Sequence, residues 1–172
     1  MSLYIVSTPI GNLEDITLRA LETLKKVDLI AAEDTRHSGI LLKKYEIEKK
    51  CLSFHSHSGQ AKVDRIIDEL VDGKDVALIS DAGTPGISDP AYVLIQAALE
   101  NDIDIIPVPG PAAFLTALTA SGLPTNQFVY LGFLPLKKGR HTLLTSLKEE
   151  KRTVVFYESP HRIVKFVGEL LE

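Results

Sequence analysis

The segment richest in residues suited to ligand chemistry is Ser80–Pro90, SDAGTPGISDP, which leaves an apolar run and enters a helical one. Gly83 and Gly86 lack the Cβ atom that would keep a ligand away from the backbone. The prolines stiffen the turn, so little order must be gained when a ligand binds. Asp89 is expected to cap the next helix, with Pro90 at its first position. The segment predicts a ligand-binding turn, although a tight, well-capped turn without a ligand explains the same pattern.

The glycines do not follow the spacing of the common nucleotide-binding loops. No phosphate loop ending in Lys-Ser/Thr occurs, and no GxGxxG follows the first strand-like run. A second stiff turn of small residues, Val108–Ala113, again joins a strand-like run to a helical one. We expect it to form another wall of the same cleft. Nucleoside triphosphates and dinucleotides are therefore weak candidates for the ligand.

A third loop carries ionisable groups. Glu33 and Asp34 follow the apolar run Leu29–Ala32, and Arg36 comes two residues after Asp34. Two carboxylates beside a guanidinium offer a candidate general base and a candidate phosphate clamp in one loop. A helix N-cap with its local ion pair explains the same residues without any catalysis. Both interpretations stay open at this point.

Metal and cysteine chemistry have little support in the sequence. His55 and His57 follow the short strand-like run Cys51–Phe54 and would point the same way in an extended chain. Because no third His or Cys lies nearby, we expect these histidines to be polar surface or ligand-contact residues and expect no metal. Cys51 is the only cysteine, which excludes an internal disulfide and suits a reducing cytoplasm.

Alternating strand-like and helical segments must position these loops. In the run Gln60–Asp72, for example, apolar residues recur three and four positions apart and form one stripe. Repeated strand–helix units predict an α/β protein with a mostly parallel sheet, whose ligand site lies beyond the carboxyl ends of its strands. The expected strands are 3–7, 29–32, 76–80, 104–108, 128–131 and 154–157, and the expected helices are 17–26, 38–45, 60–72, 90–101, 112–121, 139–148 and 162–171.

Charge is distributed unevenly along the chain. Residues 1–121 contain 11 Lys and Arg against 18 Asp and Glu, whereas residues 122–172 contain 8 against 5. The net charge of -4 argues against a protein that binds nucleic acid by bulk electrostatics. Any polyanion should bind mainly to the more basic carboxyl-terminal part. A chance asymmetry of solvated surfaces explains the same charges. The candidate contacts for such a polyanion are His55, Lys137, Lys138, Arg140, His161 and Arg162.

Two domains are expected, divided where composition and charge change. Residues 1–121 form an α/β domain that carries the glycine- and proline-rich loops. Residues 122–172 supply only two strands and two helices, which bury too little surface for a hydrophobic core of their own. The sequence also stops inside a helical pattern. We therefore expect an incomplete second α/β domain. No apolar run approaches the roughly 20 residues of a membrane span and no basic leader is present, so we expect a soluble cytoplasmic protein with no membrane partner.

Six blocks of sequence, in this order, resemble one known family. They are Val6–Leu13, Ala32–Arg36, Ser80–Pro90, Pro107–Ala113, Gly132–Pro135 and Phe156–Arg162. On these blocks the chain resembles the small-subunit ribosomal RNA 2'-O-methyltransferase I family of the tetrapyrrole-methylase superfamily. The resemblance implies a class III methyltransferase fold, with S-adenosylmethionine in a cleft between two α/β domains, and a homodimer. The family's proteins continue past the position of Glu172, so we expect this chain to lack part of the cofactor pocket.

The same resemblance implies 2'-O-methylation of a cytidine ribose in small-subunit (16S) ribosomal RNA or its particle. Because the cofactor carries an activated methyl group, no covalent nucleophile is required, and a nearby base assists the hydroxyl. Glu33, Asp34 and Arg36 are the catalytic candidates. The chain departs from the family at two places. Ala112 stands where the family commonly has serine, and the loop 136–140 contains fewer arginines than the corresponding loop of the family. The implied cofactor contacts are Pro9, Asp81, Ala82, Gly83, Ile87, Ser88, Pro111, Ala112, Ala113, Leu134 and Tyr157.

Two other functions remain open from the sequence. A superfamily relative that methylates a tetrapyrrole or a protein side chain is mildly favoured by the acidic overall charge. The basic carboxyl-terminal segment and the block Glu33–Arg36 disfavour it. An inactive cofactor-binding fragment is the remaining alternative, and the abrupt end of the chain favours it.

Overall fold

The computed structural model describes residues 1–55 and 58–171, and the chain divides into two compact units, Met1–Ala113 and Phe114–Glu172. The domain boundary predicted from composition, at residue 122, lies after the helix Ala113–Ala120. The boundary between the two compact units lies at the first residue of that helix, so the helix belongs almost entirely to the second unit. Each unit is described separately below.

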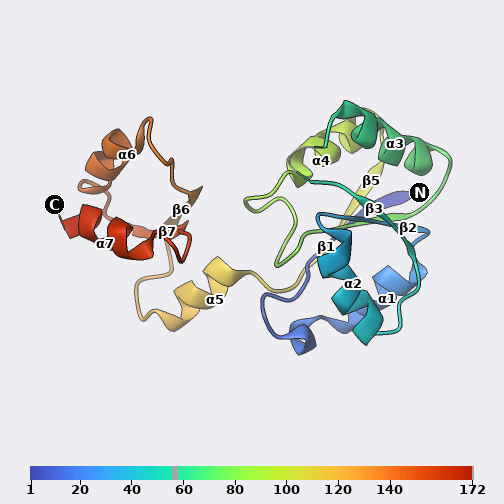
Figure 1. The fold of residues 1–172 in the computed structure, drawn as a ribbon, viewed down its shortest axis with the longest axis horizontal. Helices are drawn as coiled ribbons and strands as arrows, with labels where there is room; N and C mark the ends of the chain where they lie inside the picture. Colours follow the sequence, from blue (N-terminus) through green and yellow to red (C-terminus); the bar gives the residue numbers. More distant parts are fainter. Residues whose placement is uncertain (56–57, 172) are drawn as a thin grey trace. The chain divides into compact units, whose positions relative to one another are not determined.

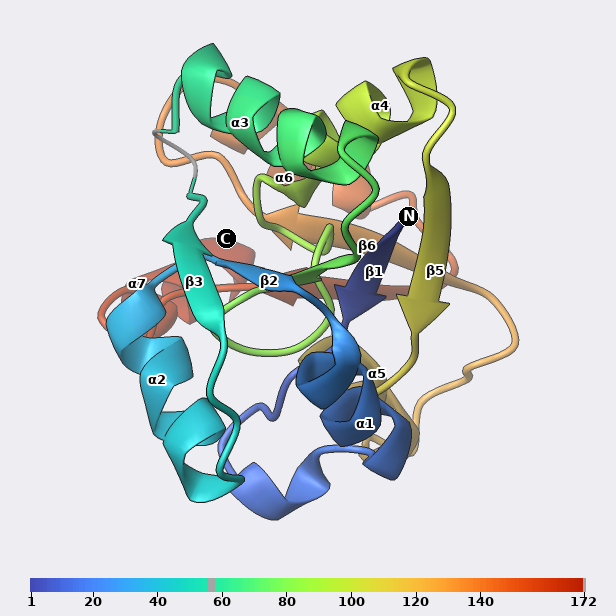
Figure 2. The same cartoon turned by 90° about the vertical axis from the view of Figure 1, so that its right-hand side faces the viewer.

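The first unit is a parallel sheet with helices on both faces (Figures 1 and 2). The sheet has five strands in the order β3-β2-β4-β1-β5, and every neighbouring pair is parallel. The predicted parallel α/β sheet is thereby confirmed. The elements are β1 Ser2–Val6, a short 3-10 helix Leu13–Asp15, α1 Leu18–Lys26, β2 Leu29–Ala32, α2 Thr35–Lys44, β3 Lys50–Ser53, α3 Gln60–Val71, β4 Val76–Ile79, α4 Ala91–Glu100 and β5 Asp104–Val108.

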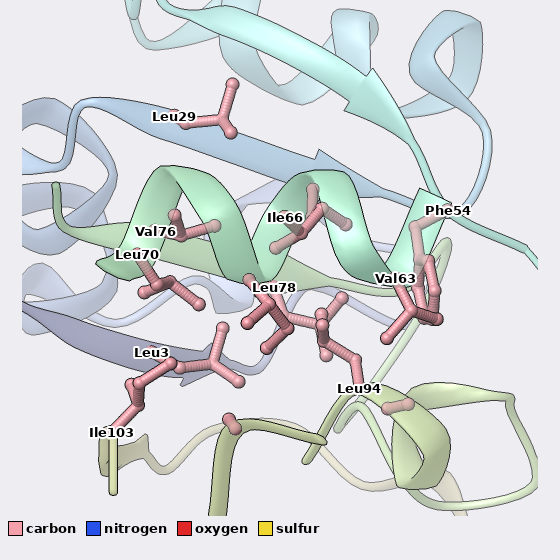
Figure 3. Packing of buried hydrophobic residues seen from close by; sticks show 14 of the residues in the cluster. Leu3, Leu29, Phe54, Val63, Ile66, Leu70, Val76, Leu78, Leu94 and Ile103 are labelled. Atoms are coloured by element: carbon pink, nitrogen blue, oxygen red, sulfur yellow. The ribbon is translucent and has the colours of Figure 1, made fainter. Parts of the chain in front are cut away.

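Alternate residues of the strands pack against opposite layers of helices. In β1, Leu3 and Ile5 join a cluster with α3 and α4, whereas Val6 joins a second cluster with α1 and α2. Figure 3 shows the first cluster, to which Leu78 of β4 and Ile66 of α3 both belong. Both sides of the sheet are therefore buried, which explains why the strands are apolar without strict alternation.

Aspartate side chains of the preceding loops accept hydrogen bonds from the first amides of two helices. Helix α2 begins at Thr35, not at Ser38 as expected, because the Asp34 carboxylate accepts a hydrogen bond from the amide of Arg36. Helix α4 begins at Ala91, one residue later than expected, so its N-cap residue is Pro90 and the prediction of Asp89 as N-cap is wrong. Asp89 still accepts a hydrogen bond from the Ala91 amide at 2.9 Å. The polar residues of both loops thus fix where the following helices start.

The second unit contains a parallel pair of strands and three helices. Strands β6 and β7 pair from Phe128 with Thr153 to Phe133 with Tyr157. Phe166 is 1% exposed and meets Phe156 edge-on, with ring centroids 4.8 Å apart. Among the described residues, no helix is long and apolar enough to cross a membrane. The elements are α5 Ala113–Ala120, β6 Phe128–Phe133, α6 Arg140–Leu147, β7 Thr153–Tyr157 and α7 Ile163–Leu171.

Candidate functional site

The order of the strands predicts a ligand-binding crevice at the carboxyl ends of β1 and β4. These two strands are neighbours, but β1 continues through α1 to β2 on one side, whereas β4 continues through α4 to β5 on the other. In open α/β sheets, ligands bind beyond the carboxyl ends of the strands at such a point of reversal. The loops that follow β1, β4 and β5 all start at this edge, as the sequence predicts.

The loops after β1 and β4 are joined directly by backbone hydrogen bonds. The Thr8 amide donates to the Gly83 carbonyl at 2.8 Å, and the Gly83 amide donates back to Thr8 at 3.1 Å. The Thr8 hydroxyl also donates to the Ser80 carbonyl at 3.1 Å. Thr8 is buried, so these bonds are shielded from water. The two loops therefore move as one piece.

The loop after β5 is joined to the same piece. The hydroxyl oxygens of Ser7 and Thr84 lie 2.9 Å apart, and the Thr84 hydroxyl donates to the Pro111 carbonyl at 3.1 Å. Gly110 packs so closely on Ser7 that a Cβ atom there would lie 2.8 Å from the Ser7 Cβ. A glycine is required at 110 because no larger residue fits this approach.

The loop after β4 holds an unusual backbone. Gly83, Gly86 and Ser88 have φ angles of +85°, +92° and +66°. A serine rarely adopts the left-handed conformation, and such residues persist only where the surroundings hold them. Asp89 provides part of that support, because both of its carboxylate oxygens accept from the Gly86 amide at 2.9 Å. The loop is thus fixed in shape before any ligand binds.

Backbone amides join Glu33, Asp34 and Asp81 into one cluster where β2 and β4 end. The Asp34 amide donates to Asp81 Oδ1 at 3.0 Å, and the Asp81 amide donates to Glu33 Oε2 at 3.4 Å. Burial raises the pKa of Glu33, and the charges of Asp81 and Asp89 act in the same direction. The Asp81 amide and His55 oppose this rise. Glu33 is therefore the carboxylate whose pKa moves toward neutral pH.

Asp34 and Arg36 form the capped helix start with its local ion pair that the sequence leaves open as an alternative. The Arg36 guanidinium lies against both Asp34 oxygens, with Nε–Oδ1 and Nη2–Oδ2 distances of 3.1 and 2.7 Å. These hydrogen bonds hold the pKa of Asp34 well below its usual range. Asp34 is consequently a weak proton acceptor at neutral pH. A catalytic role for either residue stays a prediction.

A cavity of about 260 Å³ opens beside this cluster. Its walls are the loop after β1, the first turns of α2 and the start of the loop after β4. Pro9, Asp81 and Ala82 line it, whereas the other candidate cofactor residues of this unit, Gly83, Ile87, Ser88 and Pro111–Ala113, lie outside it. The cavity therefore covers only part of the predicted cofactor site.

Sequence reasoning missed Ser38, which also lines this cavity. It is 4% exposed, and its Oγ has no hydrogen-bond partner within the described part of the chain. The available signal is its position in α2, where it shares the buried face with Leu41 and Leu42. A serine on an apolar helix face marks a site worth testing, because buried hydroxyl groups are normally satisfied.

The candidate RNA contacts fall into two groups in the structure. Arg140 and Arg162 pair with Glu158, whose side chain is 2% exposed, at 3.6 and 2.8 Å. Arg140 also pairs with Glu169 at 2.7 Å. The two arginines thus already stabilise the second unit around Glu158, which sequence reasoning missed. Lys137, Lys138 and His161 are exposed, and His55, whose amide donates to Ser58 Oγ at 2.9 Å, is half-buried.

The two candidate cofactor contacts of the second unit lie in its packed part. Leu134 is 4% exposed. The Tyr157 hydroxyl accepts from the Phe114 amide at 3.2 Å, which holds the start of α5. Its ring packs edge-on against Tyr130, with centroids 5.7 Å apart. Both residues are therefore held in place by their own unit.

Metal binding has no visible basis in the described residues. No group of three or more His, Cys, Asp and Glu side chains there is arranged to hold an ion. His57, the partner of His55 in the sequence pattern, lies outside the described residues.

Comparison with known proteins identifies the family. A family model described as Tetrapyrrole (Corrin/Porphyrin) Methylases matches residues 2–172. The chain belongs to the tetrapyrrole methylase family. Within that family it is 51% identical over 170 residues to ribosomal RNA small subunit methyltransferase I of Escherichia coli O157:H7. It is 50% identical over 170 residues to the protein of the same name from Thermotoga maritima. The resemblance seen in the sequence is confirmed.

The methylase relatives differ in how much of their length the chain spans. It covers 59% of the E. coli protein and 77% of the T. maritima protein. Among solved methylase structures, a cobalamin biosynthetic enzyme, cobalt precorrin-4 methyltransferase, matches with a TM-score of 0.74 at 21% identity, covering 99% of this chain and 74% of that one. Uroporphyrin III C-methyltransferase from Thermus thermophilus matches with a TM-score of 0.67 at 20% identity, covering 99% and 76%. At these identities the structures show the fold, and the predicted tetrapyrrole-methylase fold is confirmed.

Proposed function

We propose that this methylase acts on small-subunit ribosomal RNA, with S-adenosylmethionine as methyl donor and the ribose 2'-hydroxyl of a cytidine as acceptor. The observation that carries the proposal is the identity of about half of all residues, over nearly the whole chain, to proteins named ribosomal RNA small subunit methyltransferase I. The tetrapyrrole alternative has the description of the family behind it and a likeness of fold to solved structures at 20 and 21% identity.

The crevice between β1 and β4 has the properties that S-adenosylmethionine requires. When bound, this cofactor supplies a methyl group already activated on a positively charged sulfur. Asp81 would offer a carboxylate to attract that charge, and the fixed loop 81–90 presents backbone groups at its two positive-φ glycines. We assign Pro9, Asp81, Ala82, Gly83, Ile87, Ser88 and Pro111–Ala113 to the cofactor from the first unit, and Leu134 and Tyr157 from the second.

Glu33 is our candidate for the group that takes the hydroxyl proton. A ribose hydroxyl is weakly acidic, so a base whose pKa lies nearer to neutral pH assists its attack on the methyl group. Burial raises the pKa of Glu33, whereas Arg36 lowers that of Asp34. We therefore place Glu33 before Asp34 as the base. Asp34 and Arg36 then orient the loop that carries it.

RNA phosphates would meet the exposed basic residues first. Lys137 and Lys138 lie in the exposed loop before α6, and His161 precedes α7. Arg140 holds this loop through Glu158 and Glu169, while Arg162 is partly exposed beside Glu158. Phosphate contacts of this kind position the RNA, and they weaken as salt rises. Assembly as a homodimer remains a prediction.

Two measurements test the proposal. Isothermal titration of S-adenosylmethionine into this chain, with the E. coli relative as positive control, tests the cofactor site. Transfer of labelled methyl groups to small-subunit particles that lack the modification tests the acceptor. A 2'-O-methyl group makes the adjacent phosphodiester resistant to alkali, which identifies the atom modified. If the chain binds S-adenosylmethionine but transfers no methyl group to ribosomal RNA, the proposed substrate is rejected. If the E. coli relative binds S-adenosylmethionine and this chain does not, the proposal that this chain holds a sufficient cofactor site is rejected.

A further inference from the structure

The cavity beside Asp81 contains a buried polar group that the fold does not use. Ser38 is 4% exposed and lines this cavity of about 260 Å³. Its Oγ finds no hydrogen-bond partner among the residues that the structure describes. Native proteins rarely leave such a group unsatisfied, and a ligand or ordered water commonly supplies the partner.

The other hydroxyl groups of the cavity wall are already engaged. Thr8 Oγ1 donates to the Ser80 carbonyl at 3.1 Å, and Ser80 Oγ lies 3.5 Å from the carbonyl oxygen two residues ahead. Apolar side chains, including Ile10 and Leu41, form much of the remaining wall. A molecule that enters therefore meets apolar surface together with three polar side chains, the hydroxyl of Ser38, the carboxylate of Asp81 and the imidazole of His37.

The size of the cavity limits what can enter. Sites for drug-sized ligands span about 300–1,000 Å³, and this cavity is smaller. A single flat ring with polar atoms on its edge fits both the volume and the wall. Proteins that select one RNA nucleotide commonly take an unstacked base into such a pocket and hydrogen-bond to its edge.

We propose that this cavity receives the base of the acceptor nucleotide, and that Ser38 Oγ hydrogen-bonds to the polar edge of that base. The identity of the base as cytosine rests on the proposed function. Pro9 and Asp81 belong both to the cavity wall and to the loops assigned to the cofactor. A nucleotide held here adjoins the cofactor loops, and Ser38 is then a residue that determines specificity.

The direct test is titration of cytidine into the isotopically labelled chain, observed by NMR. We expect shifts at the amides of Ile10, Ser38 and Asp81. Ser38→Ala removes only the hydroxyl, and we expect it to weaken cytidine binding about tenfold, because the edge of the base loses its partner. Ser38→Val also fills the cavity and should abolish binding. Both variants should keep the affinity for S-adenosylmethionine within about twofold of the wild type.

Stability distinguishes this role from a structural one. Because Ser38 Oγ has no partner in the described chain, Ser38→Ala should leave the midpoint of thermal unfolding unchanged or higher. Ser146→Ala in α6 is the control, since its Oγ donates to the Leu143 carbonyl at 2.7 Å and lies in the other unit. A lower midpoint for Ser38→Ala, or cytidine binding equal to that of the wild type, overturns the proposal.

Two further outcomes separate this proposal from the proposed function. If cytidine binding depends on Ser38 but no methyl group is transferred to small-subunit particles, the assignment of the cavity is supported and the proposed ribosomal substrate is rejected. If Ser38→Val transfers methyl groups as fast as the wild type, the assignment of the cavity to the base is rejected and the proposed ribosomal substrate is retained. Equal losses of cytidine and S-adenosylmethionine affinity in Ser38→Ala assign the cavity to the cofactor instead and overturn the proposal.

Discussion

The Asp34 backbone amide donates a hydrogen bond to the Asp81 carboxylate, with the nitrogen and oxygen 3.0 Å apart. This bond joins the residue that caps α2 to the second residue of the loop after β4. It fixes Asp81 where that residue lines the cavity. The helix cap and the candidate cofactor loop are therefore parts of one arrangement, so a change at Asp81 affects both binding and geometry unless the substitute still accepts this bond.

Asp81→Asn separates the charge of this residue from its geometry. The amide oxygen still accepts from Asp34, but the negative charge is lost. We expect the affinity for S-adenosylmethionine to fall about tenfold, or about 1.4 kcal/mol, and that for S-adenosylhomocysteine, whose sulfur is uncharged, to fall less. Isothermal titration of both ligands measures the difference. Asp64→Asn in α3, which removes the same charge elsewhere, should change neither affinity, and equal losses for both ligands at Asp81→Asn would contradict a role for its charge.

Gly110→Ala tests whether the loop after β5 must approach Ser7 closely. The new Cβ would lie 2.8 Å from the Ser7 Cβ, so the loop must shift and the Ser7–Thr84 contact must change. We expect a loss of about 1–3 kcal/mol in the free energy of unfolding, as is typical of overpacking, together with weaker cofactor binding. Gly39→Ala in α2, where nothing lies within 4 Å of the added atom, should instead stabilise by about 0.5–1 kcal/mol. Urea unfolding of both variants provides the comparison.

The sequence predicts the elements well because their signals are local. Buried parallel strands are short apolar runs, and β2 and β5 end at the predicted residues. The predicted start of α2 is wrong because the polar residues Glu33–His37 fit both a loop and the capped helix start that the sequence leaves open, and only the structure shows that Asp34 caps the helix. Elements defined by capping geometry are therefore less predictable than elements defined by apolar periodicity.

The candidate site also contains features that the local sequence predicts and features that it does not. Glycines and prolines reveal which loops lie at the crevice, because tight turns need them regardless of the partner loop. The roles of Ser38 and Glu158 depend on packing between segments far apart in the chain. Glu158 meets Arg140 from another element, and Ser38 becomes informative only when its hydroxyl is seen to be buried without a partner. No pattern within one segment encodes either relationship.

Tyr157→Phe tests how Tyr157 supports the second unit. The substitution keeps the ring but removes the hydroxyl that accepts from the Phe114 amide. We expect a loss of about 1 kcal/mol in the free energy of unfolding, since that amide loses its partner. Tyr92→Phe in α4 is the matched control, because Tyr92 is 66% exposed and should tolerate the change. Urea unfolding monitored by near-ultraviolet circular dichroism measures both, and equal losses would show that the bond to Phe114 contributes nothing.

Glu158→Gln tests the ion pairs around which the second unit is built. The Ser159 amide, followed by the charges of Arg162 and Arg140, holds the pKa of Glu158 below its ordinary value of 4.5. A carboxyl group whose pKa is lower in the folded state stabilises fully above the unfolded pKa, and this contribution is lost as pH falls through the folded pKa. We therefore expect the wild type to be more stable than Glu158→Gln at pH 7, with the difference shrinking steadily below about pH 4.5.

Salt distinguishes this buried arrangement from an ordinary surface pair. Glu150 pairs with Arg152, whose side chain is 50% exposed, whereas Arg140 beside Glu158 is 13% exposed. Ions screen exposed pairs more than buried ones. At 1 M salt and pH 7, the effect of Glu150→Gln on the midpoint of unfolding should therefore vanish, while that of Glu158→Gln should persist. If both effects vanish together, Glu158 acts as a surface charge, and Arg140 and Arg162 are available to bind RNA phosphates without any cost to the fold.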